Sequence, residues 1–283
     1  MKYVLLLSFL LSGFLSAAVL EDIHKPKIDQ VVAVRLTEEI KLDGLLHEHV
    51  WHNGHGIEEF RQLEPHEGGE PSEPTLVHVA FDDEALYIGA RLYDSAPDSI
   101  IAMLGRRDVQ LSSDLFAVFI DPYHDRRSGF YFGVNAAGTR YDGTLYNDEW
   151  EDDSWDGVWE SRTSRDDKGW STEIRIPFSQ LRFKEAGSTW GINFRRDIQR
   201  KKEEIFLAYT PKNSSGFVSR FVDLVGVHDI NPSQHFELMP YVRAKAELDR
   251  SQTDNPFHGG SRRTPGFGLD VKYGLGPNLT LDA

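Results

Sequence analysis

The sequence predicts an all-β fold, in which an antiparallel, jelly-roll-like β-sandwich is followed by the first strands of an outer membrane β-barrel. Three observations lead to this prediction. Short apolar or alternating segments, typical of strands, recur along the chain and are separated by turn residues. Only brief segments favour a helix. Near the C-terminal end, two alternating segments are longer than the others.

The clearest strands form two hairpins. Residues 75–81 and 85–93 alternate between apolar and polar positions on either side of three acidic turn residues, which predicts an antiparallel pair. The apolar runs 114–121 and 129–135 predict a second pair. The same reasoning predicts further strands at 31–40, 158–165, 170–176, 189–198 and 205–209, helical turns within 45–53, 97–103 and 179–183, and a loop at 60–74.

The C-terminal segment has a different character. Apolar and polar residues alternate without interruption from Phe236 to Leu248, and again from Phe267 to Leu275 after a loop rich in Gly, Asn and Ser. Strands of about ten residues with one apolar and one polar face are typical of outer membrane barrels. We therefore expect residues 229–283 to be the start of a truncated barrel domain, with an extra sheet of the soluble domain as the alternative.

Composition and the N-terminal segment limit the possible functions. The 283-residue chain has a formal net charge of −14, which disfavours binding to nucleic acid. It has no cysteine, which excludes thiol catalysis and thiolate metal sites. Lys2, the apolar run from Val4 to Leu11 and the small residues 16–18 are typical of a secretory signal peptide. We therefore expect a signal peptide at 1–18, a lead segment at 19–34, and export to the periplasm or outer membrane of a Gram-negative bacterium.

The segment from Tyr146 to Trp155 combines indole rings with carboxylates. Trp150 and Trp155 stand among so many acids that we expect exposed rings, which stack well on a sugar ring; capping of a sandwich edge is the alternative. Carboxylates nearby can accept hydrogen bonds from sugar hydroxyls. The predicted carbohydrate-binding residues are Trp150, Trp155, Tyr146, Asn135, Tyr141, Arg106, Arg107 and Asp108.

The charged residues of these segments have other possible roles. Calcium prefers oxygen ligands, and we expect Asp148, Asp152 and Asp153 to supply them, although their spacing is not that of an EF-hand loop; a solvated acidic loop is the alternative. Two of the acids could also form the carboxyl pair of a glycoside hydrolase. Arg106, Arg107 and Asp108 could instead form buried ion pairs.

Two other groups of residues are interpreted as structural. We expect a solvated strand end at the basic cluster Arg195, Arg196, Arg200, Lys201 and Lys202. We expect core positions at Trp51, Trp159, Trp170 and Trp190.

Several motifs together resemble one family. They are Leu42-Asp-Gly44 with Glu48-His-Val-Trp51, Phe60-Arg-Gln-Leu-Glu-Pro65, Phe81-Asp-Asp-Glu-Ala-Leu-Tyr-Ile88, Arg106-Arg-Asp108, Phe119-Ile-Asp-Pro-Tyr123 and Trp170-Ser-Thr-Glu-Ile-Arg-Ile-Pro-Phe178. In combination they resemble a family 9 carbohydrate-binding-module-like domain, over about residues 35–228. The version most similar precedes an uncharacterised barrel domain in bacterial outer membrane proteins. The resemblance implies a β-sandwich that binds sugars, often with calcium.

The chain departs from this family at the expected sugar clamp. Sugar-binding members hold a ligand ring between two tryptophans, one of them just before the strand that corresponds to 114–121. Here that place holds residues 111–113, Leu-Ser-Ser, and the region of the second tryptophan has Phe217. Sugar binding would then rest on other aromatic residues.

The leading hypothesis is a noncatalytic carbohydrate-binding domain of an exported cell envelope protein, which captures oligo- or polysaccharides for uptake or degradation. The C-terminal strands would attach it to the outer membrane. One alternative is a structural periplasmic or plug domain that binds no sugar. A second is a glycoside hydrolase that hydrolyses O-glycosyl compounds, and a haem-binding sandwich ranks last because Met103 and Met239 are poorly placed.

Overall fold

The computed structural model describes residues 28–53, 55–109, 111–183, 189–230, 236–247, 262–274 and 280–282. The expected signal peptide lies outside these residues. The chain divides into two compact units, Met1–Pro232 and Ser233–Ala283. None of the described helices combines the length and the apolar composition needed to cross a membrane.

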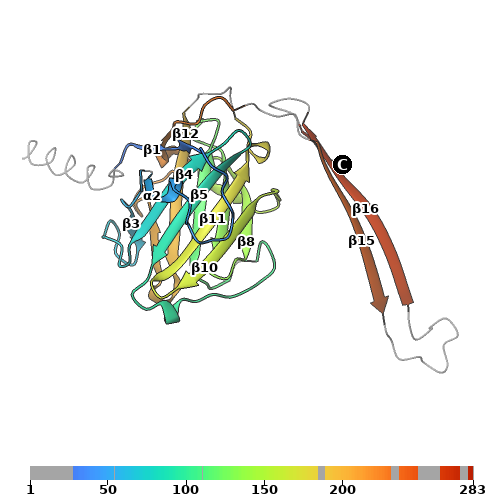
Figure 1. Ribbon diagram of the computed structural model, residues 1–283, viewed down its shortest axis with the longest axis horizontal. Coiled ribbons are helices and arrows are strands. Elements are labelled where there is room, and N and C mark those ends of the chain that lie inside the picture. The colour runs from blue at the N-terminus through green and yellow to red at the C-terminus, as the bar shows by residue number, and fades with distance from the viewer. Residues whose placement is uncertain are drawn as a thin grey trace, which may run out of the picture. The chain divides into compact units, whose positions relative to one another are not determined.

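The first unit contains two β-sheets that pack face to face (Figure 1). The larger sheet, nine-stranded in the described residues, consists of β1 (Gln30–Val32), β14 (Val222–Val225), β12 (Trp190–Ile198), β6 (Leu115–Asp121), β7 (Gly129–Asn135), β8 (Arg140–Tyr146) and β9 (Trp150–Asp152), with β13 (Glu203–Phe206) beside β12 and β3 (Arg61–Glu64) beside β13. The smaller, five-stranded sheet consists of β10 (Glu160–Asp166), β11 (Gly169–Pro177), β5 (Ala85–Tyr93), β4 (Thr75–Phe81) and β2 (Val34–Arg35). In the part of the chain that the structure describes, helical structure is limited to α2 (Val50–Asn53) and the 3-10 turns η1 (Pro97–Ser99), η2 (Phe178–Gln180), η3 (Gln199–Lys201) and η4 (Val218–Arg220).

Strand alternation explains how the core forms between the sheets. In β6, Phe116, Val118 and Ile120 are fully buried in the main core, together with residues such as Ile88 and Ile174 of the smaller sheet. Successive residues of a strand point to opposite faces, so every second residue of β6 points away from this core. The expected core positions Trp159, Trp170 and Trp190 are confirmed, and Trp51 is buried in a separate cluster with Leu46.

The outer face of the larger sheet has an apolar cluster of its own. Its buried members are Ala117, Phe119, Tyr131, Leu145, Val218 and Phe221. Phe217 packs edge-on against Phe119, with ring centroids 4.9 Å apart. Three members of this cluster, Ala117, Phe119 and Tyr131, also line the candidate site.

The structure confirms the predicted sandwich and both predicted hairpins. Strands β4 and β5 pair antiparallel, as do β6 and β7, and β11 pairs with both β5 and β10. The prediction of one strand at 31–40 is wrong, because β1 pairs with β14 of the larger sheet and β2 with β4 of the smaller one. The loop predicted at 60–74 contains β3, whose partner is β13.

The basic cluster was interpreted wrongly at Arg196, which is fully buried between the sheets rather than solvated. Its guanidinium donates hydrogen bonds to the backbone oxygens of Pro74 (2.8 Å) and Tyr93 (2.5 Å). The alternation of β12 gives the reason, because Arg196 shares its inward face with Phe194 and Ile192, which are also fully buried.

The second unit contains β15 (Phe236–Glu247), β16 (Arg262–Gly274) and β17 (Thr280–Asp282). Strands β15 and β16 pair antiparallel along their whole length, and β16 begins earlier than predicted. Val242 and Phe267 lie opposite each other in this register and are 86% and 92% exposed. Whether these strands open a barrel stays a prediction.

Candidate functional site

A pocket of about 140 Å³ lies on the outer face of the larger sheet. Its apolar and aromatic lining comes from outward-facing residues of three neighbouring strands: Leu115, Ala117 and Phe119 of β6, Tyr131 of β7 and Tyr141 of β8. Its polar lining consists of Ser113, Asn135, Glu151, Arg195, Asp197 and Gln199. The pocket therefore offers rings at its floor and charged groups beside them.

Two glycines allow the tyrosine rings to lie across the sheet. Gly133 pairs with Tyr141 and Gly143 pairs with Tyr131 in the register of β7 and β8. A Cβ atom added at Gly133 would lie 2.0 Å from Cε2 of Tyr141, and one added at Gly143 would lie 2.6 Å from Cε1 of Tyr131. Each ring thus occupies the space above its glycine, which a larger residue would fill.

The Tyr141 hydroxyl is chemically unusual. Its oxygen is buried and has no hydrogen-bond partner within the described part of the chain. Burial raises the pKa of Tyr141 well above its ordinary value, so the group stays a neutral hydroxyl that can both donate and accept. A buried polar group without a partner is unfavourable, and Tyr141 lines the pocket, so a ligand that reached this hydroxyl would supply the missing partner.

The cation of the pocket is held by acids. The Nε and Nη2 atoms of Arg195 donate to the two carboxylate oxygens of Asp197, both at 2.7 Å, and Nη2 also donates to Oε1 of Glu204 at 3.2 Å. The guanidinium lies over the ring of Phe206, 5.6 Å from its centroid. Such bidentate pairing fixes the guanidinium and neutralises it locally.

Glu151 is the pocket's unpaired acid. Glu151 lies on β9 directly opposite Leu145, so both side chains are on the outer face of the larger sheet. Glu151 makes no ion pair within the described residues. Loss of water around its carboxyl group, together with nearby Asp153, raises the pKa of Glu151 against the opposing effect of Arg195. Its carboxylate can accept hydrogen bonds from a ligand.

Apolar residues extend the rim of the pocket. Val109 and Leu111 line it, and Val109 is 45% exposed. Residues 111–113 stand where the family resemblance places a clamping tryptophan; Leu111 and Ser113 of this segment line the pocket, with side chains smaller than tryptophan.

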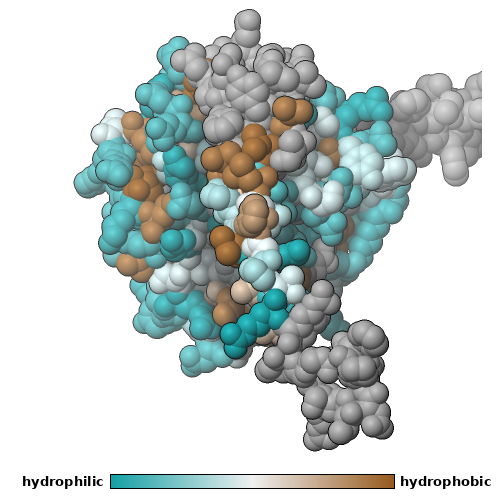
Figure 2. Space-filling view, turned by 90° about the vertical axis from the view of Figure 1, so that its right-hand side faces the viewer, coloured by the Kyte–Doolittle hydropathy of each residue, from teal (hydrophilic) through white to brown (hydrophobic). Residues whose placement is uncertain are grey.

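The side of the molecule that lies at the right of Figure 1 carries hydrophobic patches between hydrophilic residues (Figure 2).

Comparison with known proteins decides the family. Residues 42–205, more than half of the chain, match the family model described as carbohydrate family 9 binding domain-like. The chain belongs to this family. No match was found among curated proteins.

Solved structures agree with this family 9-like assignment at the level of the fold. A family 9 carbohydrate-binding module from Caldicellulosiruptor kristjanssonii, in complex with glucose, is 18% identical with a TM-score of 0.52, and the alignment covers 72% of this chain and 100% of that one. A candidate carbohydrate-binding protein from Bacteroides uniformis is 15% identical with a TM-score of 0.52, covering 70% and 99% of the two chains. Both likenesses support the β-sandwich.

Two of the residues predicted for sugar binding line the pocket of this family 9-like domain. They are Tyr141, described above, and Asn135. The Asn135 amide is already used within the fold: Nδ2 donates to the Met103 backbone oxygen at 2.7 Å and Oδ1 accepts from the Thr139 backbone N–H at 2.9 Å. Asn135 therefore positions the turn after β7 at the edge of the pocket.

The aromatic residues of the acidic segment lie elsewhere. Residues 146–155 are not all loop, because β9 pairs with β8 and places Trp150 opposite Tyr146. The two rings meet edge-on with centroids 5.5 Å apart and are 58% and 41% exposed. By strand alternation they face away from the side that carries Glu151. They form a separate exposed aromatic pair.

Trp155 packs against the main core. Its ring lies 5.2 Å from that of Phe130 and 6.0 Å from that of Phe132, between centroids. This arrangement corresponds to capping of a sandwich edge, which was the alternative to a stacking role.

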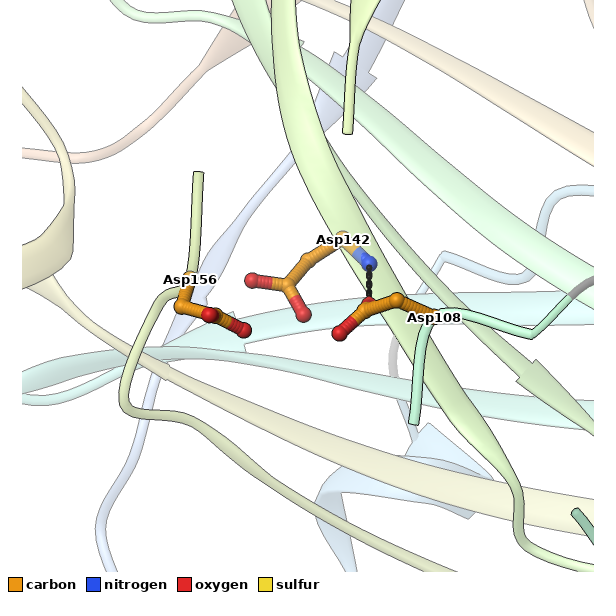
Figure 3. Close-up of side chains that lie close together, drawn as sticks. All are labelled: Asp108, Asp142 and Asp156. Atoms are coloured by element: carbon orange, nitrogen blue, oxygen red, sulfur yellow. Dashed lines mark hydrogen bonds between the residues drawn. The ribbon is translucent and has the colours of Figure 1, made fainter. Parts of the chain in front are cut away.

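Arg107 and Asp108 belong to a charged network. The carboxylates of Asp108, Asp142 and Asp156 come from three segments and point toward one another, with oxygens within 4.8 Å (Figure 3). The Nε atom of Arg107 lies 2.9 Å from Oδ1 of Asp142, 3.5 Å from Asp108 and 3.4 Å from Asp156. The guanidinium therefore supplies the positive charge among these acids, while Arg106 is exposed. This geometry fits the ion-pair alternative for Arg107 and Asp108.

The residues predicted to bind calcium do not form a comparable group in the described structure. The carboxylate of Asp148 accepts hydrogen bonds from the backbone N–H groups of Phe217 (3.0 Å) and Ser219 (2.8 Å). Asp152 accepts from the backbone N–H and hydroxyl of Ser154, and Asp153 is exposed. Calcium binding in this segment stays a prediction.

Sequence reasoning did not find most of the pocket residues. Phe119, Tyr131, Glu151, Arg195 and Asp197 meet there although they come from four strands. One signal was present: the alternation of the predicted β6–β7 hairpin gives an outward face on which Phe119 lies directly opposite Tyr131.

Proposed function

We propose that this chain contains a noncatalytic carbohydrate-binding domain that holds one sugar ring in the pocket on the outer face of the larger sheet. The observation that carries the proposal is the buried Tyr141 hydroxyl without a partner, on a ring that lines the pocket together with those of Tyr131 and Phe119. Aromatic faces pack on the apolar face of a sugar, while hydroxyl and carboxylate groups bind its hydroxyls. The glucose bound by a family member with the same fold supports this choice of ligand.

The size of the pocket favours a single ring. Its volume of about 140 Å³ is close to that of an engineered protein cavity of about 150 Å³ that holds benzene, also a six-membered ring. The pocket is bounded by the open face of a sheet, so the remainder of an oligosaccharide would extend into solvent.

The charge arrangement supports binding rather than hydrolysis. A glycoside hydrolase needs two carboxyl groups placed on either side of the scissile bond, one of them able to give a proton. Both carboxylate oxygens of Asp197 already accept hydrogen bonds from Arg195. Glu151 is then left as a single available carboxylate, which can orient a sugar but cannot form the pair.

We also infer that the protein is exported and captures saccharides at the cell envelope for uptake or degradation, in the periplasm or at the outer membrane. The signal-peptide pattern of residues 1–18 supports export. The long alternating strands β15 and β16, with exposed Val242 and Phe267, support attachment to the outer membrane. Cell fractionation with N-terminal sequencing of the mature protein tests both points.

Calorimetric titration of gluco-oligosaccharides into the protein tests the binding site. Tyr141→Phe removes only the hydroxyl and should weaken binding about two- to tenfold, the usual worth of one neutral hydrogen bond. Trp150→Ala is the matched control, because it alters an exposed ring outside the pocket and should leave the affinity unchanged. Loss of binding in Trp150→Ala alone would move the site to the Tyr146–Trp150 pair. No binding of any saccharide would favour the structural, plug-like alternative.

A further inference from the structure

The charges that line the pocket do not balance. Among the described residues that line it, Arg195 is the cation, while Glu151 and Asp197 are acids. Arg195 is already bound by Asp197 and by Glu204 behind it. No positive charge is left over for a ligand, whereas the carboxylate of Glu151 has no ion-pair partner in the described structure. The three charged residues that line the pocket therefore sum to one negative charge, and Glu151 is the acid among them without an ion-pair partner.

The uncharged lining of the pocket is also suited to a cation. The rings of Phe119, Tyr131 and Tyr141 line it beside Glu151. The face of an aromatic ring carries partial negative charge and attracts ammonium groups. Burial raises the pKa of Tyr131 and of Tyr141, so neither contributes a full charge, and their rings act through the quadrupole.

We propose that the pocket selects saccharides carrying a protonated amine, such as 2-amino-2-deoxy sugars, over neutral and acidic ones. The inference rests on the proposed function, since it concerns the same pocket. The sugar ring packs on the tyrosines, and the ammonium group donates to the carboxylate of Glu151. An acidic sugar meets Glu151 without any free cation to compensate and is rejected.

The expected gain in affinity for an amino sugar follows from the replacement of one sugar hydroxyl by an ammonium group. A hydrogen bond between two charged groups is roughly twice as strong as a neutral one, which corresponds to about a tenfold gain in affinity. Glu151 lies on β9, a strand at the edge of the larger sheet, so added salt should reduce the gain.

The experiment compares two trisaccharides that differ only at the second carbon of each ring. Cellotriose carries hydroxyls there, and the β-1,4-linked trimer of glucosamine carries amines, which are protonated at about pH 6, below the pKa of about 7.7 to 8.0 of an α-amino group. Both are titrated calorimetrically into the full chain. Cellotriose should also displace the glucosamine trimer if the two share the pocket.

Two variants separate a local effect from the general attraction of a chain with net charge −14 for cations. Glu151→Gln removes the pocket carboxylate and should cancel the preference for the amine. Asp167→Asn removes the same charge from the exposed turn between β10 and β11, on the other sheet, and should keep the preference.

The possible results are distinct. A roughly tenfold preference that is lost in Glu151→Gln and kept in Asp167→Asn supports the inference. Equal or tighter binding of cellotriose, or an undiminished amine preference in Glu151→Gln, overturns the inference and leaves the proposed function standing. If neither trisaccharide, nor any other, binds, the proposed function fails and the inference fails with it.

Discussion

Replacement of Arg196 by methionine should remove much of the stability of the sandwich. This side chain projects from the larger sheet and is fully buried. Its Nη1 atom donates to the Pro74 backbone oxygen at 2.8 Å and to Oγ1 of Thr75 at 3.0 Å, and Nη2 donates to the Tyr93 backbone oxygen at 2.5 Å. One guanidinium thus joins the beginning of β4 and the end of β5 to β12 of the opposite sheet.

The loss of stability in Arg196→Met follows from the buried groups that lose their hydrogen-bond or charge partner. Methionine has a similar length and keeps the apolar packing, but the oxygens of Pro74 and Tyr93 lose a charged donor. The buried carboxyl of Asp114 also loses the cation that opposes its desolvation. Hydrogen bonds to a charged group contribute about 1.5 to 3 kcal/mol each, so loss of the bonds to the Pro74 and Tyr93 oxygens should cost about 3 to 5 kcal/mol. In a domain of this size each kcal/mol lowers the Tm by about 2 to 4 °C, so we expect a decrease of roughly 6 to 20 °C.

Urea unfolding followed by near-UV circular dichroism measures this effect. Arg35→Met is the matched control: Arg35 pairs with Asp83 at 2.7 Å, but the two side chains are 37% and 80% exposed. An exposed pair contributes less than about 1 kcal/mol. A loss below about 1 kcal/mol for Arg196→Met, or an equal loss for both variants, would refute the role of Arg196 as a tie between the sheets.

Two other predictions concern the pocket and its support. Gly133→Ala places a methyl group 2.0 Å from Cε2 of Tyr141 and should displace its ring. We expect a loss of about 1 to 3 kcal/mol of stability and, by calorimetry, an affinity for sugar at least about tenfold weaker. Normal affinity would show that the ring is not part of the site. Burial raises the pKa of Asp148, but hydrogen bonds from Ser219 and Phe217 outweigh burial and hold this pKa below its ordinary value of 3.8. A depressed carboxyl pKa stabilises the fold above the unfolded pKa and loses this effect as the pH falls through the folded pKa. Asp148→Asn should therefore be less stable by about 1 kcal/mol at pH 7, with a deficit that shrinks below about pH 4 in urea titrations; a constant deficit would contradict the argument.

The parts of the fold that were predicted depend on local patterns. The β4–β5 and β6–β7 hairpins each combine clear strand patterns with a short connection, and both were found. Strand β8 was not found, because its inward position is the fully buried Asp142, whose partner Arg107 lies far away in the sequence. A polar residue at an inward position breaks the alternation typical of a strand, so the sequence pattern indicates a loop until the partner of that residue is known.

The pocket could be predicted only in part for a similar reason. Asn135 and Tyr141 were chosen from one segment of the chain, while Arg195 and Asp197 come from β12, which reaches β7 only through β6. Pairing between distant strands is not encoded in local alternation. The family resemblance directed attention to residues 111–113, of which Leu111 and Ser113 line the pocket, although the tryptophan expected there is absent.

The distribution of the indoles determines how binding can be observed. Trp51, Trp159, Trp170 and Trp190 are buried and Trp155 packs on the core, so the exposed Trp150 dominates any response of the emission to solvent or quenchers. No tryptophan lines the pocket among the residues described. Intrinsic fluorescence would consequently report on the wrong surface: a sugar could fill the pocket without changing the spectrum, and a quenching signal would indicate contact at the strand edge instead. Heat measurements, or the NMR signals of the tyrosine rings, observe the pocket directly.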